Sequence, residues 1–157
     1  MIEKLEDHEI KDIMGIWLKT TVTAHSFIPE KYWIESYDKV IEGYIPFSTT
    51  FTYKEDGIIK GFISTRDNSF IGALFVLEDY QGKSIGKKLL NYCKSLYSSL
   101  ELCVYVKNEN AVNFYKNCGF VIKSKQPNEN SGFMEYGILT PSIFHHSERH
   151  CMAFLEL

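Results

Sequence analysis

The sequence predicts one α/β domain, of the α+β kind, whose central sheet is mixed and mostly antiparallel, with one parallel pair and about four flanking helices. A chain of 157 residues is long enough for one hydrophobic core and too short for two comfortable domains. Apolar residues recur at helical spacing over residues 10–17 and 37–44, which predicts two helices after a short strand in residues 1–5. Strand patterns and further helices follow.

Residues 49–79 have the pattern of three antiparallel strands. Two runs of β-forming residues, 49–55 and 58–67, are separated by Asp56-Gly57, a typical hairpin turn. The third run, 69–79, is mostly apolar, as expected of a strand that is buried on both faces.

A strand, a helix, a strand and a helix follow one another in the second half of the chain. The run 69–79 leads to apolar residues at helical spacing from Ile85 to Leu96, then to a buried strand over 100–106. A short helix over 110–118 ends at Gly119, and residues 121–126 and 133–139 predict a closing hairpin. Consecutive strands joined by a helix must be parallel, with a right-handed crossover.

The charge and hydropathy of the chain exclude several classes of protein. A formal net charge of −3 argues against a nucleic-acid binder that works by bulk electrostatics. No basic amino-terminal region precedes an apolar stretch, and nowhere do 18 apolar residues run together, so a cytoplasmic protein without a membrane segment is expected.

The four cysteines, Cys93, Cys103, Cys118 and Cys151, lack metal-binding spacing and are expected to be mostly buried, reduced thiols. The carboxy-terminal group of His145, His146, His150 and Cys151 fits no standard zinc pattern, so no metal is expected.

The loop between the third strand and the following helix contains Gly82-Lys83-Ser84, which matches the end of a nucleotide-binding P-loop. A P-loop also requires a glycine with four residues between it and Gly82, and Leu77 stands there. The intervening Glu78 and Asp79 would place two carboxylates against a polyanion. The sequence therefore argues against binding of a nucleoside triphosphate.

The same loop has a second interpretation. The pattern Gln81-x-x-Ser84-x-Gly86 can direct successive amides at a phosphate, at the start of a helix whose dipole favours negative charge. An ordinary turn between strand and helix would account for these residues equally well.

A second motif, in residues 106–120, places Asn108 just after a buried strand and Tyr115 on the short helix that ends at Gly119-Phe120. Together with the first loop, it resembles the GNAT superfamily of acyl-CoA-dependent N-acyltransferases. The resemblance extends from the first helix to about residue 139, and it is greatest with small bacterial members that carry an Ala-His-x-Phe-Ile/Leu segment, here residues 24–28. The domain is accordingly taken as residues 1–139, with 140–157 as a tail that could add a strand.

The resemblance implies a site for acetyl-CoA as co-substrate. It implies that backbone amides of the loop bind the diphosphate of the cofactor, that strand residues bind its pantetheine arm and that Asn108 contacts it. The implied residues are Leu74, Phe75, Val76, Gln81, Gly82, Lys83, Ser84, Ile85, Gly86, Lys87 and Asn108. Two positions depart from the family pattern: Ser84 replaces the usual glycine, and Cys103 stands where relatives often have a carboxylate.

The reaction that the resemblance implies is direct attack of an amine on the thioester. Only a neutral amine attacks, and with an unperturbed pKa of ~10.4 roughly one lysine in a thousand is neutral near pH 7, so a proton acceptor helps. The candidates are His25, Glu101 and Glu109; His25 is slightly favoured because histidine titrates near working pH, although it could equally be a hydrogen-bonding loop residue. Tyr115 is the expected general acid for the thiolate, with a core aromatic as its alternative.

The acceptor is expected to be a primary amine, either a small molecule or a protein lysine or N-terminus. Phe27 and Tyr32 follow His25 and are expected to line the acceptor entrance or to pack beneath it. From a different class, the chain could be a non-catalytic domain that binds or senses acyl-CoA. A monomer or homodimer is expected.

Overall fold

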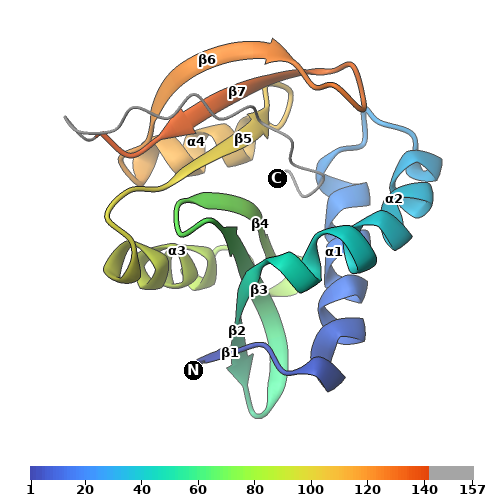
Figure 1. Ribbon diagram of the computed structural model, residues 1–157, viewed down its shortest axis with the longest axis vertical. Helices are drawn as coiled ribbons and strands as arrows, with labels where there is room; N and C mark the ends of the chain where they lie inside the picture. Colours follow the sequence, from blue (N-terminus) through green and yellow to red (C-terminus); the bar gives the residue numbers. More distant parts are fainter. Residues whose placement is uncertain (142–157) are drawn as a thin grey trace.

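The computed structural model describes residues 1–141 of the chain. Its elements follow one another along the sequence as shown in Figure 1. They are β1 (Ile2–Lys4), η1 (Asp7–Glu9), α1 (Ile10–Ala24), α2 (Glu30–Gly43), η2 (Ile45–Phe47), β2 (Thr49–Glu55), β3 (Ile58–Arg66), β4 (Phe70–Val76), η3 (Glu78–Tyr80), α3 (Ile85–Leu96), β5 (Glu101–Tyr105), α4 (Glu109–Asn117), β6 (Val121–Pro127) and β7 (Met134–Leu139).

The seven strands form one sheet in the order β1-β2-β3-β4-β5-β7-β6. Every neighbouring pair is antiparallel except β4 and β5, which are parallel. The predicted fold class is therefore confirmed, including the three antiparallel strands, the parallel pair, the closing hairpin and the four helices. The second helix begins at Glu30, well before the apolar repeat that predicted it, because its first turns expose most of their side chains.

The helices cover both faces of the sheet, and strand alternation decides which residues meet them. Phe62 and Phe75 belong to the core cluster that α1 and α2 supply, while their neighbours Ile63 and Leu74 belong to the cluster that α3 and α4 supply. In Figure 1, α1 and α2 lie on one side of the strands and α3 lies on the other. A sheet buried on both faces explains why β4 reads as a continuous apolar run.

The parallel pair is the feature of the sheet that matters most for function. β4 and β5 pair in register at Phe70 and Glu101, at the start of each strand. Beyond this point each strand pairs only with its other neighbour within residues 1–141, β4 with β3 and β5 with β7. The carboxyl ends of β4 and β5 therefore diverge, and Figure 1 shows them separating.

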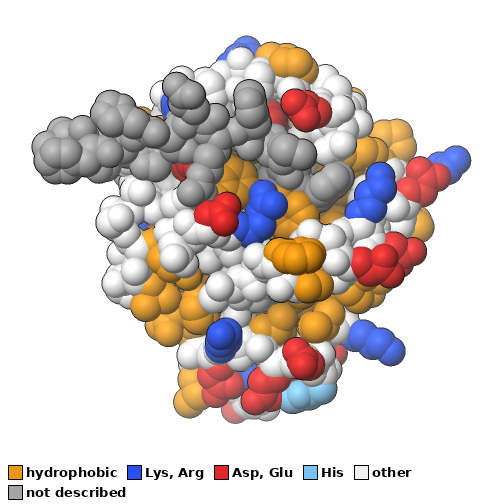
Figure 2. All heavy atoms as spheres, in the orientation of Figure 1, with side chains coloured by type: hydrophobic (Ala, Val, Ile, Leu, Met, Phe, Trp, Pro, Cys, Tyr) orange, Lys and Arg blue, Asp and Glu red, His pale blue; other side chains and the backbone are white. Residues whose placement is uncertain are grey.

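The structure also bears on membrane-spanning segments, on surface charge and on the cysteines. No helix within residues 1–141 is long and apolar enough to cross a membrane. On the face drawn in Figure 2, several acidic side chains lie together at the lower edge, and elsewhere acidic and basic side chains are interspersed among apolar ones. Cys93 and Cys118 are free thiols, as predicted, but Cys103 is in a disulfide, so the prediction is wrong there. The proposed extra strand and the histidine-rich group lie outside the described residues, as does Cys151.

Replacement of Gly61 by alanine should destabilise the sheet beside the diverging strands. A Cβ atom at this position would lie 2.8 Å from the Phe75 carbonyl oxygen, a backbone atom of β4 that cannot move without shifting the strand. We expect Gly61→Ala to lower the free energy of unfolding by about 1–3 kcal/mol in urea titrations. Gly15→Ala is the matched control: Gly15 is at an exposed position of α1, nothing lies within 4 Å of a Cβ atom there, and we expect a gain of about 1 kcal/mol. Equal effects of the two substitutions would contradict this account.

Candidate active site

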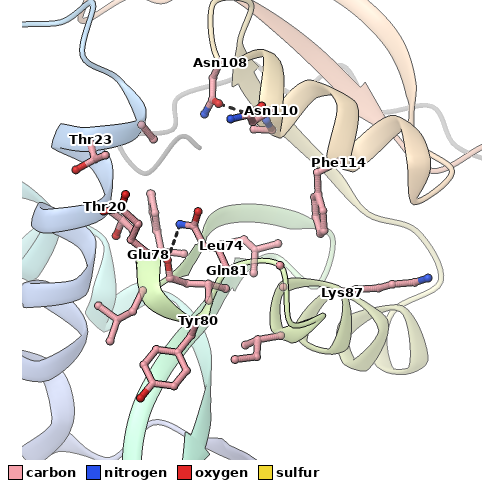
Figure 3. A pocket seen from close by; sticks show the side chains of 18 of the residues that line it. Thr20, Thr23, Leu74, Glu78, Tyr80, Gln81, Lys87, Asn108, Asn110 and Phe114 are labelled. Carbon is pink, nitrogen blue, oxygen red and sulfur yellow. Dashed lines mark hydrogen bonds between the residues drawn. The ribbon is translucent and has the colours of Figure 1, made fainter.

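A cavity of about 650 Å³ lies at the diverging carboxyl ends of β4 and β5. Ligands of open α/β sheets commonly bind in this position, because the strand ends leave a crevice between the connecting segments. Figure 3 shows side chains from α1, from the β4–α3 connection and from α4 arranged around the cavity. Its lining residues are Lys19, Thr20, Thr23, Ala24, Leu74, Phe75, Val76, Leu77, Glu78, Tyr80, Gln81, Gly82, Ser84, Ile85, Gly86, Lys87, Asn108, Asn110, Ala111 and Phe114.

The end of β4 forms one wall of the cavity. Leu74 and Phe75 are buried in opposite cores, so these two residues offer the cavity chiefly their main chain. The Gln81 side chain folds back and its Nε2 donates to the Val76 carbonyl oxygen at 2.9 Å. Polar main-chain groups are thus presented along an otherwise apolar strand.

The amino terminus of α3 forms the second wall. Gly82 and Ser84 both have positive φ, +78° and +67°, which turns the chain sharply before the helix. The first intrahelical hydrogen bond runs from the Lys88 amide to the Ser84 carbonyl at 2.9 Å, so the amides of the preceding turn have no helical acceptor. These amides and the helix dipole favour an anion at the cavity edge.

The amino terminus of α4 forms the third wall. Asn108 caps this helix, because its Oδ1 accepts a hydrogen bond from the Ala111 amide at 3.3 Å. Asn110 and Phe114 project toward the cavity from the same helix (Figure 3). The cap explains why an asparagine follows the strand here, since asparagine is among the preferred N-cap residues.

The carboxy-terminal half of α1 forms the fourth wall with Lys19, Thr20, Thr23 and Ala24. The reasoning from sequence missed these residues, together with Asn110 and Phe114. Their helical periodicity predicts a helix, but no local pattern indicates that this helix faces the carboxyl end of β4, which is a consequence of tertiary packing.

All the predicted cofactor-binding residues except Lys83 line the cavity. The Lys83 ammonium instead lies 5.1 Å from the centroid of the Tyr80 ring, outside the lining. The Lys87 side chain extends along α3 away from the cavity in Figure 3. The anion-attracting character of this end therefore resides in main-chain amides more than in lysine side chains.

Tyr115 does not line the cavity. Its side chain is fully buried in the core beneath α3 and α4, where its ring packs against Phe114 and Phe120 at centroid distances of 5.1 and 5.4 Å. Its hydroxyl has no hydrogen-bond partner within residues 1–141. Burial raises the pKa of the Tyr115 phenol well above its usual value, with a smaller contribution from Cys118, so the group keeps its proton at neutral pH.

The three candidate bases occupy different positions. Glu101 begins β5, at the closed end of the parallel pair, whereas the cavity lies at the opposite ends of these strands. Glu109 is exposed in the first turn of α4. His25 is fully buried directly after Ala24, with Nδ1 3.0 Å from Thr21 Oγ1 and Nε2 3.3 Å from Asn108 Nδ2.

The predicted acceptor residues lie beside His25. The Phe27 ring contacts the His25 ring edge-on at a centroid distance of 5.8 Å, and Tyr32 contacts Trp33 in the same way at 4.9 Å. Both are partly buried against the core under α1 and α2, and neither lines the cavity. Trp33 itself is buried in that core.

The sheet is mixed, its parallel pair opens onto a crevice, and a helix amino terminus lies at the edge of that crevice. This arrangement agrees with the acyl-CoA-dependent acyltransferase class that the two sequence motifs predicted. Residues 19–135 match the family described as acetyltransferase (GNAT) domain. The chain belongs to the GNAT acetyltransferase family.

Relatives support the same conclusion. The peptidyl-lysine N-acetyltransferase YiaC of Escherichia coli is 34% identical over 122 residues, which are 78% of this chain and 84% of YiaC. The peptidyl-lysine N-acetyltransferase YjaB of E. coli is 25% identical over 132 residues, 83% of this chain and 88% of YjaB. The solution structure of apo YjaB superposes with a TM-score of 0.77 at 22% identity, covering 88% of this chain and 95% of YjaB, and shows the same fold.

The chain is therefore an N-acetyltransferase, an enzyme that transfers an acetyl group to an amine, as predicted. Nothing in these relatives favours the alternative of a non-catalytic acyl-CoA-sensing domain.

Replacement of Ser84 by glycine should stabilise the protein. A non-glycine residue at φ +67° is strained, and the Ser84 side chain makes no capping hydrogen bond within α3 that would offset the strain. We expect Ser84→Gly to raise the free energy of unfolding by roughly 0.5–1 kcal/mol, the strain relieved less the entropy that glycine adds to the unfolded chain. Ser84→Ala keeps the Cβ atom and serves as the control without a gain. Thermal unfolding measures both, and equal gains would show that the hydroxyl, not the backbone, causes the effect.

Proposed function

We propose that the cavity binds acetyl-CoA and that the enzyme transfers its acetyl group to the side-chain amine of a lysine in a protein or peptide. The observation that carries the proposal is the position of the α3 amino terminus at the edge of a crevice between two parallel strands. That arrangement combines a site for an anion with a channel lined by main-chain groups. Coenzyme A has matching parts, because its diphosphate is an anion and its pantetheine arm contains amides that can bond to main-chain groups.

The binding part of the proposal assigns each wall a role. The amides from Gly82 to Lys87 hold the diphosphate, since they stand at a helix amino terminus. The main chain of Leu74, Phe75 and Val76 pairs with the pantetheine arm, which would have to share the Val76 carbonyl with Gln81. Asn108 contacts the arm from the opposite wall.

The chemical part of the proposal is direct transfer. The neutral lysine nitrogen attacks the thioester carbonyl carbon, a C–N bond forms, and the C–S bond breaks with its electron pair going to sulfur. The attacking nitrogen loses one proton to solvent to give the neutral amide, and the thiolate takes the proton of the Tyr115 hydroxyl. The phenolate then regains a proton from solvent before the next turnover, so that no proton is gained or lost overall. Two features support this role: the hydroxyl is a buried donor without a partner in the described chain, and its ring is in contact with Phe114 in the cavity wall.

A lysine acceptor is proposed because YiaC and YjaB are both peptidyl-lysine N-acetyltransferases. A panel of acceptors tests this proposal directly: a lysine peptide with a blocked amino terminus, the same peptide with arginine for lysine and a free amino terminus, and free polyamines. We expect release of coenzyme A thiol only with the first. Preferred acetylation of the α-amine or of polyamines would replace the lysine proposal, and no thiol release with any amine would reject acetyl transfer. The cytoplasmic location and the monomeric or homodimeric state are predictions for fractionation and sedimentation experiments.

Tyr115→Phe should separate catalysis from folding and binding. We expect kcat to fall at least about tenfold, because general acid catalysis is lost. The dissociation constant for coenzyme A, measured by calorimetry, should stay the same. The free energy of unfolding should not fall, since removing a buried hydroxyl without a hydrogen-bond partner leaves no group unsatisfied. Unchanged kcat would remove Tyr115 from the mechanism.

Gly86 provides a test of the diphosphate site. A Cβ atom here would lie 3.5 Å from Phe114 Cζ, an ordinary contact, so Gly86→Ala should fit and bind coenzyme A nearly as well as the natural protein. Gly86→Asp places a carboxylate among the same amides, and like-charge repulsion should weaken binding at least about tenfold. Calorimetry compares the two variants; equal affinities would mean that the diphosphate lies elsewhere.

A further inference from the structure

His25 lies where the two helices on opposite sides of the cavity come together. It follows Ala24, the last residue of α1, and its side chain is fully buried among the rings of Phe27, Trp33 and Tyr105. Its two ring nitrogens face Thr21 on its own helix and Asn108 at the start of α4. The second contact joins residues 83 positions apart in the sequence.

The orientation of the Asn108 amide fixes the proton on the His25 ring. Asn108 Oδ1 accepts from the Ala111 amide, so the group that faces His25 Nε2 is the Nδ2 amino group, a donor without acceptor capacity. An Nε2 atom that accepts this hydrogen bond is unprotonated, which leaves the ring proton on Nδ1. In that tautomer Nδ1 donates to Thr21 Oγ1, which lies 3.0 Å away.

This arrangement locks Asn108 at both ends of its carboxamide. The oxygen caps α4 and the nitrogen donates to His25, so the side chain cannot rotate without losing both bonds. Thr20 and Ala24 of α1 and Asn108, the N-cap of α4, all line the cavity, and the His25–Asn108 contact joins these two walls. A histidine that accepts a hydrogen bond at Nε2 already uses the lone pair that a base would need.

We propose that His25 is a positioning residue, a neutral imidazole with its proton on Nδ1 that fixes Asn108 and thereby shapes the acyl-CoA side of the cavity, and not the general base. This inference rests on the proposed function for its consequence in catalysis, but its structural part holds for the free protein. It replaces the interpretation of His25 as a base that the sequence favoured.

The tautomer is measured first, on the unliganded protein labelled with ¹⁵N in histidine. Long-range ¹H–¹⁵N correlations, assigned by comparison with His25→Gln, should show an Nδ1 that carries the proton and an Nε2 that is unprotonated at neutral pH. A proton on Nε2, or on both nitrogens, overturns the proposal. The result does not depend on which ligand the cavity binds.

Two matched substitutions then separate positioning from base catalysis. Glutamine places an oxygen near the former Nε2 and can still accept from Asn108, whereas asparagine reaches only the former Nδ1 and keeps the contact with Thr21. We expect His25→Asn to raise KM and the dissociation constant for acetyl-CoA by about fivefold, as for the loss of one buried hydrogen bond, with little change in kcat. His25→Gln should recover most of that affinity. A general base would give the opposite result. The value of kcat would fall to the same extent in both variants, and in both the pH dependence of kcat that arises from the base would disappear.

A double-mutant cycle covers the case in which a variant folds poorly. The free energies of unfolding of His25→Asn, Asn108→Ala and the double variant are measured without ligand. We expect the double variant to lose less than the sum of the single losses, because each substitution removes the same bond. Additive losses would overturn the link between His25 and Asn108. If the losses are not additive but no acetyl-CoA binds, the proposed function is wrong, while the contact between His25 and Asn108 is still supported.

Discussion

The site depends on the way one pair of strands is joined. β4 and β5 meet in register at Phe70 and Glu101 and then separate, so the main chain at the end of β4 faces a crevice instead of a neighbouring strand. Main-chain polar groups must find partners, and a sheet that opens between two of its own strands offers them to a ligand. The four walls of the cavity are the segments that this opening leaves facing one another.

The anion-attracting end of the cavity is built from backbone more than from side chains. The chain carries a net charge of −3, and the lysines of the loop are directed away from the cavity or lie outside its lining. The helix amino terminus concentrates donors without requiring a basic surface. The cost is local strain, since a serine is held at φ +67° to bring the chain into α3.

The core behind the cavity wall contains a second exception to ordinary packing. Tyr115 is a fully buried donor without a partner within residues 1–141, a state that it shares there with ring or guanidinium nitrogens of Trp17, Trp33 and Arg66, and native cores contain few such groups. Phenylalanine would pack in the same place without an unsatisfied hydroxyl. Retention of the phenol at that cost is consistent with a function, because natural sequences violate local packing rules mainly at functional sites.

Much of this protein could be predicted from sequence, because the relevant interactions are local. The alternation in β2 and β3 and the Asp56-Gly57 turn determine a hairpin, and the apolar run of β4 requires cover on both faces. The strand–helix–strand order forces the parallel pair, and helical spacing after Ser84 places a helix amino terminus beside it. The fold class and the position of the loop before a helix follow from these short-range rules, whereas the proposal that this loop holds a diphosphate came from the resemblance of its motif to the GNAT superfamily.

Tertiary structure alone decided the rest. Thr20, Thr23 and Ala24 line the cavity only because α1 packs across the end of β4. The sequence of α1 by itself does not predict that packing. The role proposed for His25 depends on a contact of the same kind: an isolated histidine has two usable nitrogens, and the Asn108 amide, 83 residues away, lies against one of them. Local sequence fixes the elements and their order, while the partners of each polar atom are fixed by contacts between residues distant in the chain.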